Sequence, residues 1–170
     1  MEEERDTHVG ETQELVDLAG KYLTFELGQE EYGIGILKIK EIIGMMPITA
    51  VPQTPSFIKG VINLRGKVIP VTDLRMKFGL ETADYNERTC IIVVEIDCGS
   101  QQLIMGLVVD AVSEVANIKG GEIESTPDFG NGNQTSFVKG MAKIAGGVKI
   151  LLDIDRILTG EQMSCLADMH

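Results

Sequence analysis

The chain has 170 residues, which is enough for one domain or for two small domains that fold together. Hydrophobic residues make up 44% of it and aromatic residues only 5%, so aliphatic side chains must build the core, which favours β-structure. The net charge of −11 excludes the basic surface that nucleic acids and anionic lipids require, and no run is apolar enough to span a membrane. Binding of nucleic acid and direct membrane insertion are therefore not expected.

The first 20 residues hold seven acidic side chains and one basic side chain, and they predict a flexible acidic tail over 1–20. Because they contain neither a basic segment nor an apolar stretch, they do not form a secretory signal. The three cysteines, Cys90, Cys98 and Cys165, have unrelated spacings that fit reduced thiols better than a disulfide framework. We therefore expect a cytoplasmic protein.

From Lys21 onward the pattern predicts about ten short strands separated by turns. The first five runs cover residues 22–27, 32–36, 39–43, 61–64 and 68–71, and the second five cover 90–96, 103–109, 112–118, 138–144 and 148–152. Residues 65–67 join the fourth and fifth runs in a hairpin. Pro70 predicts an edge or a bulge there, since proline cannot donate a hydrogen bond to a neighbouring strand. A capping-box pattern predicts a C-terminal helix over 159–170.

The two sets of strands repeat one another. The segment Phe57 to Gly60 recurs 80 residues later as Phe137 to Gly140, and Gly66 and Asp73 recur as Gly146 and Asp153 at the same offset. Earlier in each set, Gly33 and Glu41 recur 73 residues later as Gly106 and Glu114. Each five-strand copy can close into a small barrel, and closure removes exposed sheet edges. The repeat therefore predicts two barrels packed side by side about a pseudo-twofold axis.

Residues suited to catalysis or to metal binding are scarce. The two histidines, His8 and His170, stand near the ends, where no rigid nucleophile system or zinc site can use them. Asp73 and Asp153 are conceivable as an acid/base pair, but their equivalence in the repeat favours two helix caps. We expect no catalytic residue, no metal and no cofactor.

One difference between the copies stands at the hairpin tip, where Arg65 in the first copy corresponds to Ala145 in the second. The turn does not need an arginine, so its guanidinium is available to a partner's carboxylate. A solvated turn arginine of little energetic weight is the alternative. Glu41 either orients Arg65 or is a solvent-facing strand acid.

These same residues resemble a known family. The resemblance rests on Lys21-Tyr22-Leu23-Thr24-Phe25, Glu31-Tyr32-Gly33-Ile34, Pro55-Ser56-Phe57-Ile58-Lys59-Gly60, Val61-Ile62-Asn63-Leu64-Arg65-Gly66 and Pro70-Val71-Thr72-Asp73-Leu74-Arg75. On these runs the chain from Lys21 to about Asp168 resembles the CheW family. The resemblance implies an all-β fold of two intertwined five-stranded SH3-like barrels with short helices. It further implies a domain over 21–158, whose barrels cover roughly 21–87 and 88–158 with strand exchange.

The resemblance also implies a function. Family members are non-catalytic adaptors that couple the cytoplasmic tips of chemoreceptors (methyl-accepting chemotaxis proteins) to the regulatory domain of the histidine kinase CheA, in a two-component system. Receptor binding is then expected in the groove between the barrels, at Ile36, Ile39, Glu41, Arg65 and Val112. Kinase binding is expected at Glu124 and Phe129.

On the same grounds the chain is expected to be monomeric when isolated and to be recruited to membrane-associated receptor arrays. Three other functions are less consistent with the sequence. A nucleic-acid-binding barrel is disfavoured by the acidic charge, and an enzyme is disfavoured by the lack of a placed imidazole. A CheW-like domain inside another chemotaxis protein is the nearest alternative, and a free-standing adaptor is preferred because the chain ends soon after the second barrel.

Overall fold

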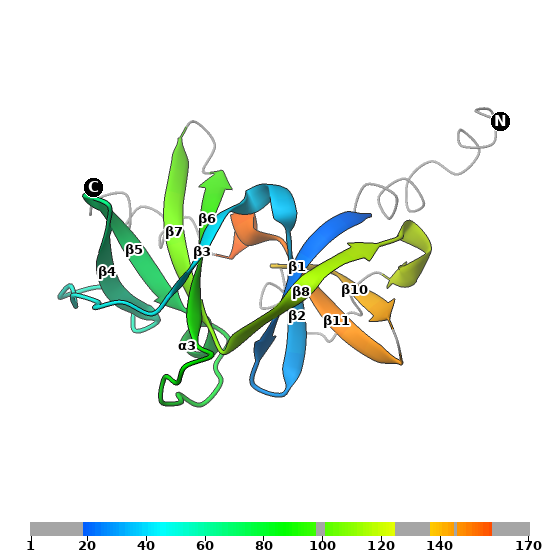
Figure 1. The fold of residues 1–170 in the computed structure, drawn as a ribbon, viewed down its shortest axis with the longest axis horizontal. Coiled ribbons are helices and arrows are strands. Elements are labelled where there is room, and N and C mark those ends of the chain that lie inside the picture. The colour runs from blue at the N-terminus through cyan, green and yellow to red at the C-terminus, as the bar shows by residue number, and fades with distance from the viewer. Residues whose placement is uncertain (1–18, 98–100, 125–136, 145, 158–170) are drawn as a thin grey trace.

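The computed structural model describes residues 19–97, 101–124, 137–144 and 146–157. This part of the chain forms two β-sheets that lie side by side, joined by short helical turns (Figure 1). Most of the expected acidic tail and all of the expected C-terminal helix lie outside the described residues. Among the helices of the described part, none has the length and hydropathy needed to cross a membrane.

The strands divide between the two sheets as follows. Sheet A has the strand order β8-β1-β2-β11-β10-β9 and consists of β1 (Gly20–Leu27), β2 (Glu30–Gly35), β8 (Ala111–Ile118), β9 (Ile123–Glu124), β10 (Val138–Ile144) and β11 (Gly147–Leu152). Sheet B has the order β3-β6-β7-β5-β4 and consists of β3 (Ile39–Gly44), β4 (Ile58–Leu64), β5 (Lys67–Asp73), β6 (Cys90–Asp97) and β7 (Gln102–Val109). The helical turns are η1 (Ile36–Lys38), α3 (Leu74–Lys77), η2 (Gly120–Glu122) and η4 (Ile154–Arg156).

The two repeats exchange strands. The chain leaves sheet A through η1, builds all of sheet B from β3 to β7, and returns to sheet A at Asp110, between β7 and β8. Sheet A therefore holds β1 and β2 of the first repeat, and sheet B holds β6 and β7 of the second. The expected division near residue 87 falls in the connection between α3 and β6.

Each sheet contains one parallel strand pair, and the two pairs occupy equivalent positions in the pseudo-twofold arrangement. In sheet B, Val71 of β5 faces Gly106 of β7; in sheet A, Leu151 of β11 faces Gly33 of β2. A Cβ atom on Gly106 would lie 2.7 Å from Cγ2 of Ile91, and one on Gly33 would lie 3.1 Å from Cδ2 of Leu151. The repeated glycines therefore mark places where a neighbouring side chain, from β6 at Gly106 and from β11 at Gly33, leaves too little room for a Cβ atom.

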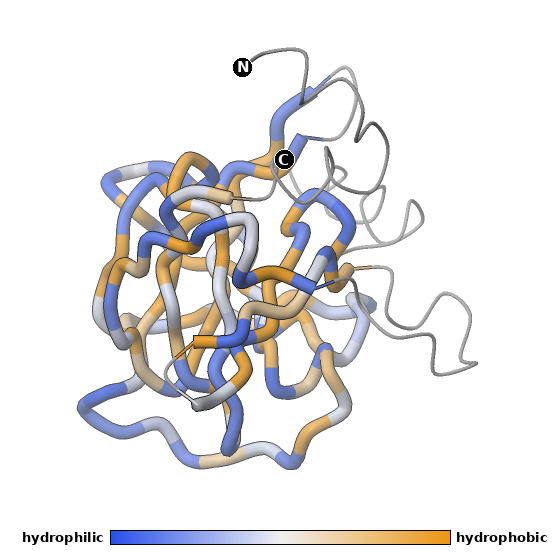
Figure 2. Tube along the Cα trace, turned by 90° about the vertical axis from the view of Figure 1, so that its right-hand side faces the viewer, coloured by the Kyte–Doolittle hydropathy of each residue, from blue (hydrophilic) through white to orange (hydrophobic). Residues whose placement is uncertain are grey.

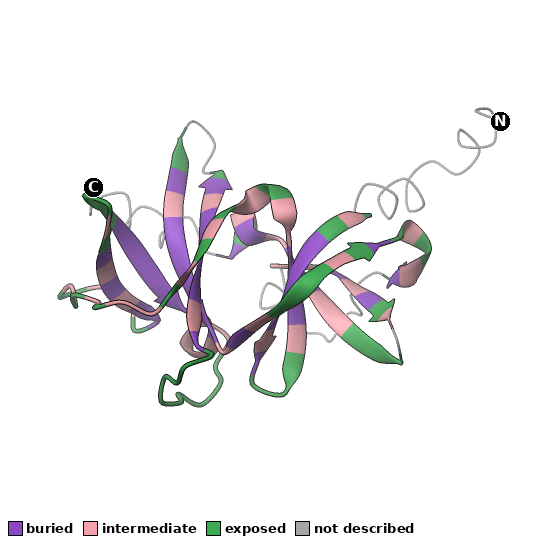
Figure 3. Cartoon of the chain, in the orientation of Figure 1, coloured by how far each residue is buried: buried purple, intermediate pink, exposed green. Residues whose placement is uncertain are grey.

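The apolar side chains form three clusters, because alternate residues of a strand face opposite sides of the sheet. The largest, here called the central cluster, joins the two sheets and includes Phe25 and Ile34 of sheet A and Ile92 and Leu107 of sheet B. Each sheet also covers a smaller cluster of its own. Hydrophilic segments are prominent at the peripheral turns, and exposed residues gather at the hairpin tips (Figures 2 and 3).

Both repeated aspartates cap helical turns, as the sequence predicted. Asp73 Oδ1 accepts a hydrogen bond from the backbone N–H of Arg75 at 3.0 Å, at the start of α3. Asp153 Oδ1 accepts one from the N–H of Asp155 at 3.1 Å, at the start of η4. The capping interpretation is confirmed at both positions.

Of the two positions expected for Pro70, an edge is wrong, because β5 lies between β7 and β4, whereas a β-bulge does lie beside it, in β4 between Ile58 and Gly60. Pro70 pairs with Val61 of β4, whose own N–H and C=O both bond to Thr49 on the far side, at 2.8 and 2.9 Å. The pair between Val61 and Pro70 is therefore a non-hydrogen-bonded one. Pairing with β7 starts only at Val71, so no partner strand requires an N–H from Pro70.

Candidate functional site

The turn between β4 and β5 places Arg65 at its tip. Arg65 has φ of 52° and Gly66 has φ of 86°, the pattern of a two-residue type I′ hairpin turn. The side-chain oxygen of Asn63 accepts a hydrogen bond from the N–H of Gly66 at 2.8 Å and closes the turn. Gly66 has the positive φ that this turn type requires. That of Arg65 was not foreseen, and a residue with a Cβ atom adopts it at a local cost of about 1 kcal/mol.

Arg65 points back across the sheet to Glu41. Its Nη2 donates a hydrogen bond to Glu41 Oε2 on β3, and the two side chains are 69% and 32% exposed. An ion pair as exposed as this one contributes little to folding stability. Because a guanidinium carries five N–H donors, the pair fixes its direction while leaving donors for another molecule. The arrangement is suited to binding a partner.

The strained turn leads to a first prediction. Arg65→Gly should raise the free energy of unfolding by about 1 kcal/mol, because glycine adopts the positive φ at no steric cost. For a chain of this size that corresponds to a melting temperature about 2 to 4 °C higher, measured by thermal unfolding. Arg88→Ala removes an ion pair of similar exposure and should leave the melting temperature unchanged within about 2 °C. A fall in the Arg65→Gly melting temperature would show that the arginine stabilises the turn.

The three apolar residues expected at the receptor site are only partly exposed to solvent. Ile36, Ile39 and Val112 are all partly buried, and all pack against the central cluster between the sheets. Sequence reasoning missed Leu37, which is 97% exposed in η1 beside Ile36. Adjacent residues of a strand-like run face opposite sides, so the pair Ile36-Leu37 already signalled that one of the two would face solvent.

The residues expected to bind the kinase lie elsewhere. Glu124 in β9 forms an ion pair with Lys143 at 2.6 Å, and both side chains are more than half exposed. Glu124 belongs to the short edge strand of sheet A, whereas Arg65 and Glu41 belong to sheet B, so the two groups form separate surfaces. Phe129 lies outside the described residues.

Exposed aliphatic side chains occur at equivalent positions of the two repeats. Ile42 in β3 is 44% exposed and its counterpart Val115 in β8 is 53% exposed. On the hairpin that follows, Val68 is 50% exposed and its counterpart Val148 is 49% exposed. Since β3 and β8 are the end strands of their sheets, each barrel presents similar apolar residues along an edge. The sequence offsets could have revealed these pairs.

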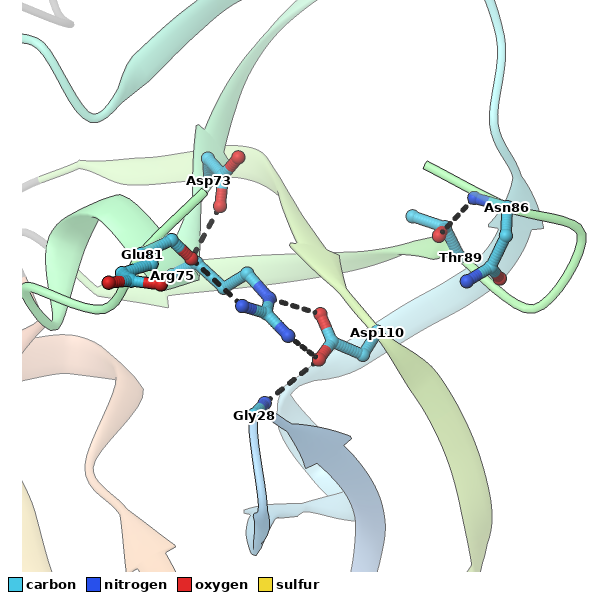
Figure 4. A network of polar contacts seen from close by, with 7 residues as sticks. All are labelled: Gly28, Asp73, Arg75, Glu81, Asn86, Thr89 and Asp110. Carbon is cyan, nitrogen blue, oxygen red and sulfur yellow. Dashed lines mark hydrogen bonds and ion pairs between the residues drawn. The ribbon is translucent and has the colours of Figure 1, made fainter. Parts of the chain in front are cut away.

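A polar network ties the barrels together on one side (Figure 4). Arg75 of α3 binds Asp110 through two hydrogen bonds of 2.8 and 2.6 Å, and Asp110 also accepts the N–H of Gly28 at 2.8 Å. Burial acts to raise the pKa of Asp110, but the hydrogen bonds from Arg75 and Gly28 outweigh it and hold that pKa below its ordinary value. Asp110 is therefore a charged link between α3 and the turn from β1 to β2.

The described residues offer hollows but no clustered metal ligands. They contain no group of three or more His, Cys, Asp or Glu side chains placed to hold a metal ion. A polar cavity of about 180 Å³ lies beside Asp73, Tyr85 and Asp110, which is below the size of usual ligand pockets. A wide, mostly apolar groove of about 590 Å³ is lined by Met45, Ile48 and other residues near Tyr85. The exposed surfaces described above are the better candidates for function.

Comparison with known proteins decides the family. The family model described as "CheW-like domain" matches residues 21–162, which is most of the chain. The chain belongs to the CheW family. The chemotaxis protein CheW of Klebsiella aerogenes is 40% identical to it over 144 residues, covering 85% of this chain and 84% of that protein. The chemotaxis protein CheW of Helicobacter pylori is 33% identical over 158 residues, covering 93% of each.

The fold of this CheW-family chain is also similar to a solved structure. The scaffolding protein TtCheW from Thermoanaerobacter tengcongensis matches with a TM-score of 0.75 and 37% identity, covering 86% of this chain and 98% of that one. The predicted pair of intertwined SH3-like barrels is confirmed, with the two-residue β9 added to the five longer strands of sheet A. The chain has the role of a coupling and scaffold protein in chemotaxis, as its sequence predicted.

Proposed function

We propose that this chain couples the cytoplasmic tips of chemoreceptors to the regulatory domain of the histidine kinase CheA by binding both. In this proposal it is a cytoplasmic, monomeric adaptor that joins receptor arrays at the membrane and catalyses no reaction. Support comes from membership of a family that includes chemotaxis and scaffolding proteins.

The receptor surface in this proposal consists of Ile36, Ile39, Glu41, Arg65 and Val112. The observation that carries it is an arginine kept at positive φ on a hairpin tip, with its guanidinium directed by Glu41. That geometry is locally unfavourable and adds little stability, so a role in binding is the better reason for it. The guanidinium would meet carboxylate or carbonyl oxygens of the receptor, and the partly buried aliphatic residues would contact its apolar side chains.

The kinase surface in this proposal includes Glu124, on β9 of sheet A, and Phe129, which lies outside the described residues. The equivalent exposed residues of the two barrels, Ile42 with Val115 and Val68 with Val148, support contacts through both barrels. Ile42 and Val115 lie on the end strands β3 and β8, which offer apolar side chains and unpaired backbone groups to a partner. Val68 and Val148 lie on the inner strands β5 and β11 and offer their side chains alone. A regulatory domain that contacts both barrels would bury these edges.

The test of the receptor surface is Arg65→Ala, measured by titration with a receptor signalling-tip fragment. Loss of a central arginine contact should weaken binding about tenfold or more, while the melting temperature stays within about 2 °C of the wild type. Arg88→Ala is a matched control: Arg88 is 64% exposed and pairs with Glu26, much as Arg65 is 69% exposed and pairs with Glu41. Equal affinities of the wild type and Arg65→Ala would refute the receptor assignment of Arg65.

A further inference from the structure

The chain crosses between the barrels twice, and an ion pair holds each crossing. At the first, Lys38 of η1 donates from Nζ to Asp155 Oδ1 of η4 at 2.8 Å. At the second, Arg75 of α3 binds Asp110 at 2.8 and 2.6 Å (Figure 4). In both cases a helical turn that follows the last strand of a hairpin reaches the segment where the chain changes sheets.

The two ion pairs share one equivalent position in the repeat, where the charges are opposite. Their other members are not equivalent, since Lys38 corresponds to Ala111 at the offset of 73. Arg75 and Asp155 both stand two residues after a capping aspartate and correspond to one another at the offset of 80. In each pair the carboxylate also accepts a backbone N–H from the other sheet. Asp110 accepts that of Gly28, and Asp155 accepts that of Asp97, both at 2.8 Å. Each pair therefore links a crossing, a helical turn and the opposite barrel.

The first crossing has little else to fix it. None of the three residues of η1 is fully buried, and η1 has no side-chain cap at its N-terminus. Leu37 is 97% exposed, so packing holds η1 mainly through the partly buried Ile36. The side chains of Lys38 and Asp155 are 37% and 31% exposed, which screens their pair less than a fully exposed one.

We infer that Lys38 and Asp155 are positioning residues that hold η1, and with it the binding surface of Ile36 and Ile39, in place relative to both barrels. The functional half of this inference rests on the proposed receptor surface. The structural half does not: it states that this pair, bridging η4, η1 and the end of β6, sets the local stability of the crossing.

Amide hydrogen exchange in the full chain tests the structural half. The N–H of Ile39 bonds to the carbonyl of Ile36 and closes η1, so its exchange reports on the crossing. Lys38→Met should speed this exchange about three- to tenfold, and Lys38→Arg should restore slow exchange. Lys40→Met is the matched control, since Lys40 pairs with Glu95 at 3.6 Å within sheet B and spans no crossing. It should leave the exchange of Ile39 unchanged.

The role of Asp155 is tested in the same way. Asp155→Asn keeps an oxygen for the N–H of Asp97 but loses the charge that attracts Lys38. It should speed the exchange of Ile39 and leave that of Asp97 nearly unchanged, whereas Asp155→Ala should speed both. Unaltered exchange of Ile39 in Lys38→Met and Asp155→Asn would overturn the inference, whatever the binding result.

Titration with the receptor fragment tests the functional half. Lys38→Met should weaken binding about threefold, and Lys38→Arg should restore it. Faster exchange with unchanged affinity, while Arg65→Ala weakens binding, would refute the positioning role and leave the proposed receptor surface standing. If Arg65→Ala also binds normally, the proposed receptor surface fails, and faster exchange of Ile39 still supports the structural half.

Discussion

Replacement of Gly60 with alanine is expected to cost at least about 4 kcal/mol of folding stability, a large fraction of the roughly 5 to 15 kcal/mol that a domain has. Gly60 has φ of 146°, a conformation that L-residues rarely adopt. A Cβ atom there would lie 2.0 Å from the carbonyl oxygen of Thr49 and 2.7 Å from its carbonyl carbon. Because these are backbone atoms, no side-chain rotation can relieve the clash.

The clash also falls where sheet B depends on an irregular pairing of its strands. Gly60 follows the β-bulge at which the pairing of β4 with β5 shifts register, and Val61 next to it exchanges two backbone hydrogen bonds with Thr49. Moving the Thr49 segment away would break those bonds. Gly44→Ala is the control, since a Cβ atom on Gly44 has no neighbour within 4 Å. Urea unfolding should find Gly44→Ala within about 1 kcal/mol of the wild type. A similar value for Gly60→Ala would contradict the geometry.

The second large effect is expected for Asp110→Ala, which removes the carboxylate. At neutral pH it should lower the free energy of unfolding by about 3 kcal/mol. The substitution leaves the guanidinium of Arg75 without its main partner, in a site where its side chain is only 21% exposed. It also removes the acceptor of the Gly28 N–H. Asp110→Asn keeps an acceptor for Gly28 and should cost about half as much. Urea unfolding measures both.

Acid should remove this difference between the wild type and Asp110→Ala. Because the pKa of Asp110 is lower in the folded chain than in the unfolded chain, its carboxylate adds stability above the unfolded pKa of about 4. That stability is lost as the pH falls through the lower, folded pKa. The lowered pKa of Glu31, held by its hydrogen bond from Lys149, affects both proteins equally and cancels in the comparison. A difference that stays constant from pH 7 to the acid limit would show that charge is not the cause.

Local patterns were sufficient to predict the strands but not their partners. Alternating aliphatic residues and repeated glycines located the hairpin at Arg65 and both capping aspartates. Edge position cannot be read from a proline alone, and the non-hydrogen-bonded pairing of Pro70 with Val61 follows from contacts with Thr49. A proline can therefore stand in an inner strand, provided that no neighbouring strand needs a hydrogen bond from its nitrogen.

The candidate site was predictable only in part, for similar reasons. Arg65 stood out because its repeat counterpart is Ala145, and its pairing with Glu41 was one of two open interpretations. The positive φ of Arg65 could not be predicted from its residue type, because arginine has no preference for that backbone conformation. Lys38 and Asp155 are 117 residues apart, and no rule of spacing links residues so distant. Only the folded topology brings them together.

The order of the strands has a consequence for synthesis on the ribosome. All five strands of sheet B come from one uninterrupted stretch of chain, whereas β2 of sheet A must pair with β11, some 118 residues downstream. Sheet B can therefore assemble as soon as β7 emerges, while the β1–β2 hairpin waits beside it for its remaining neighbours. The nascent chain can thus complete the inserted sheet B first and the neighbouring sheet A last.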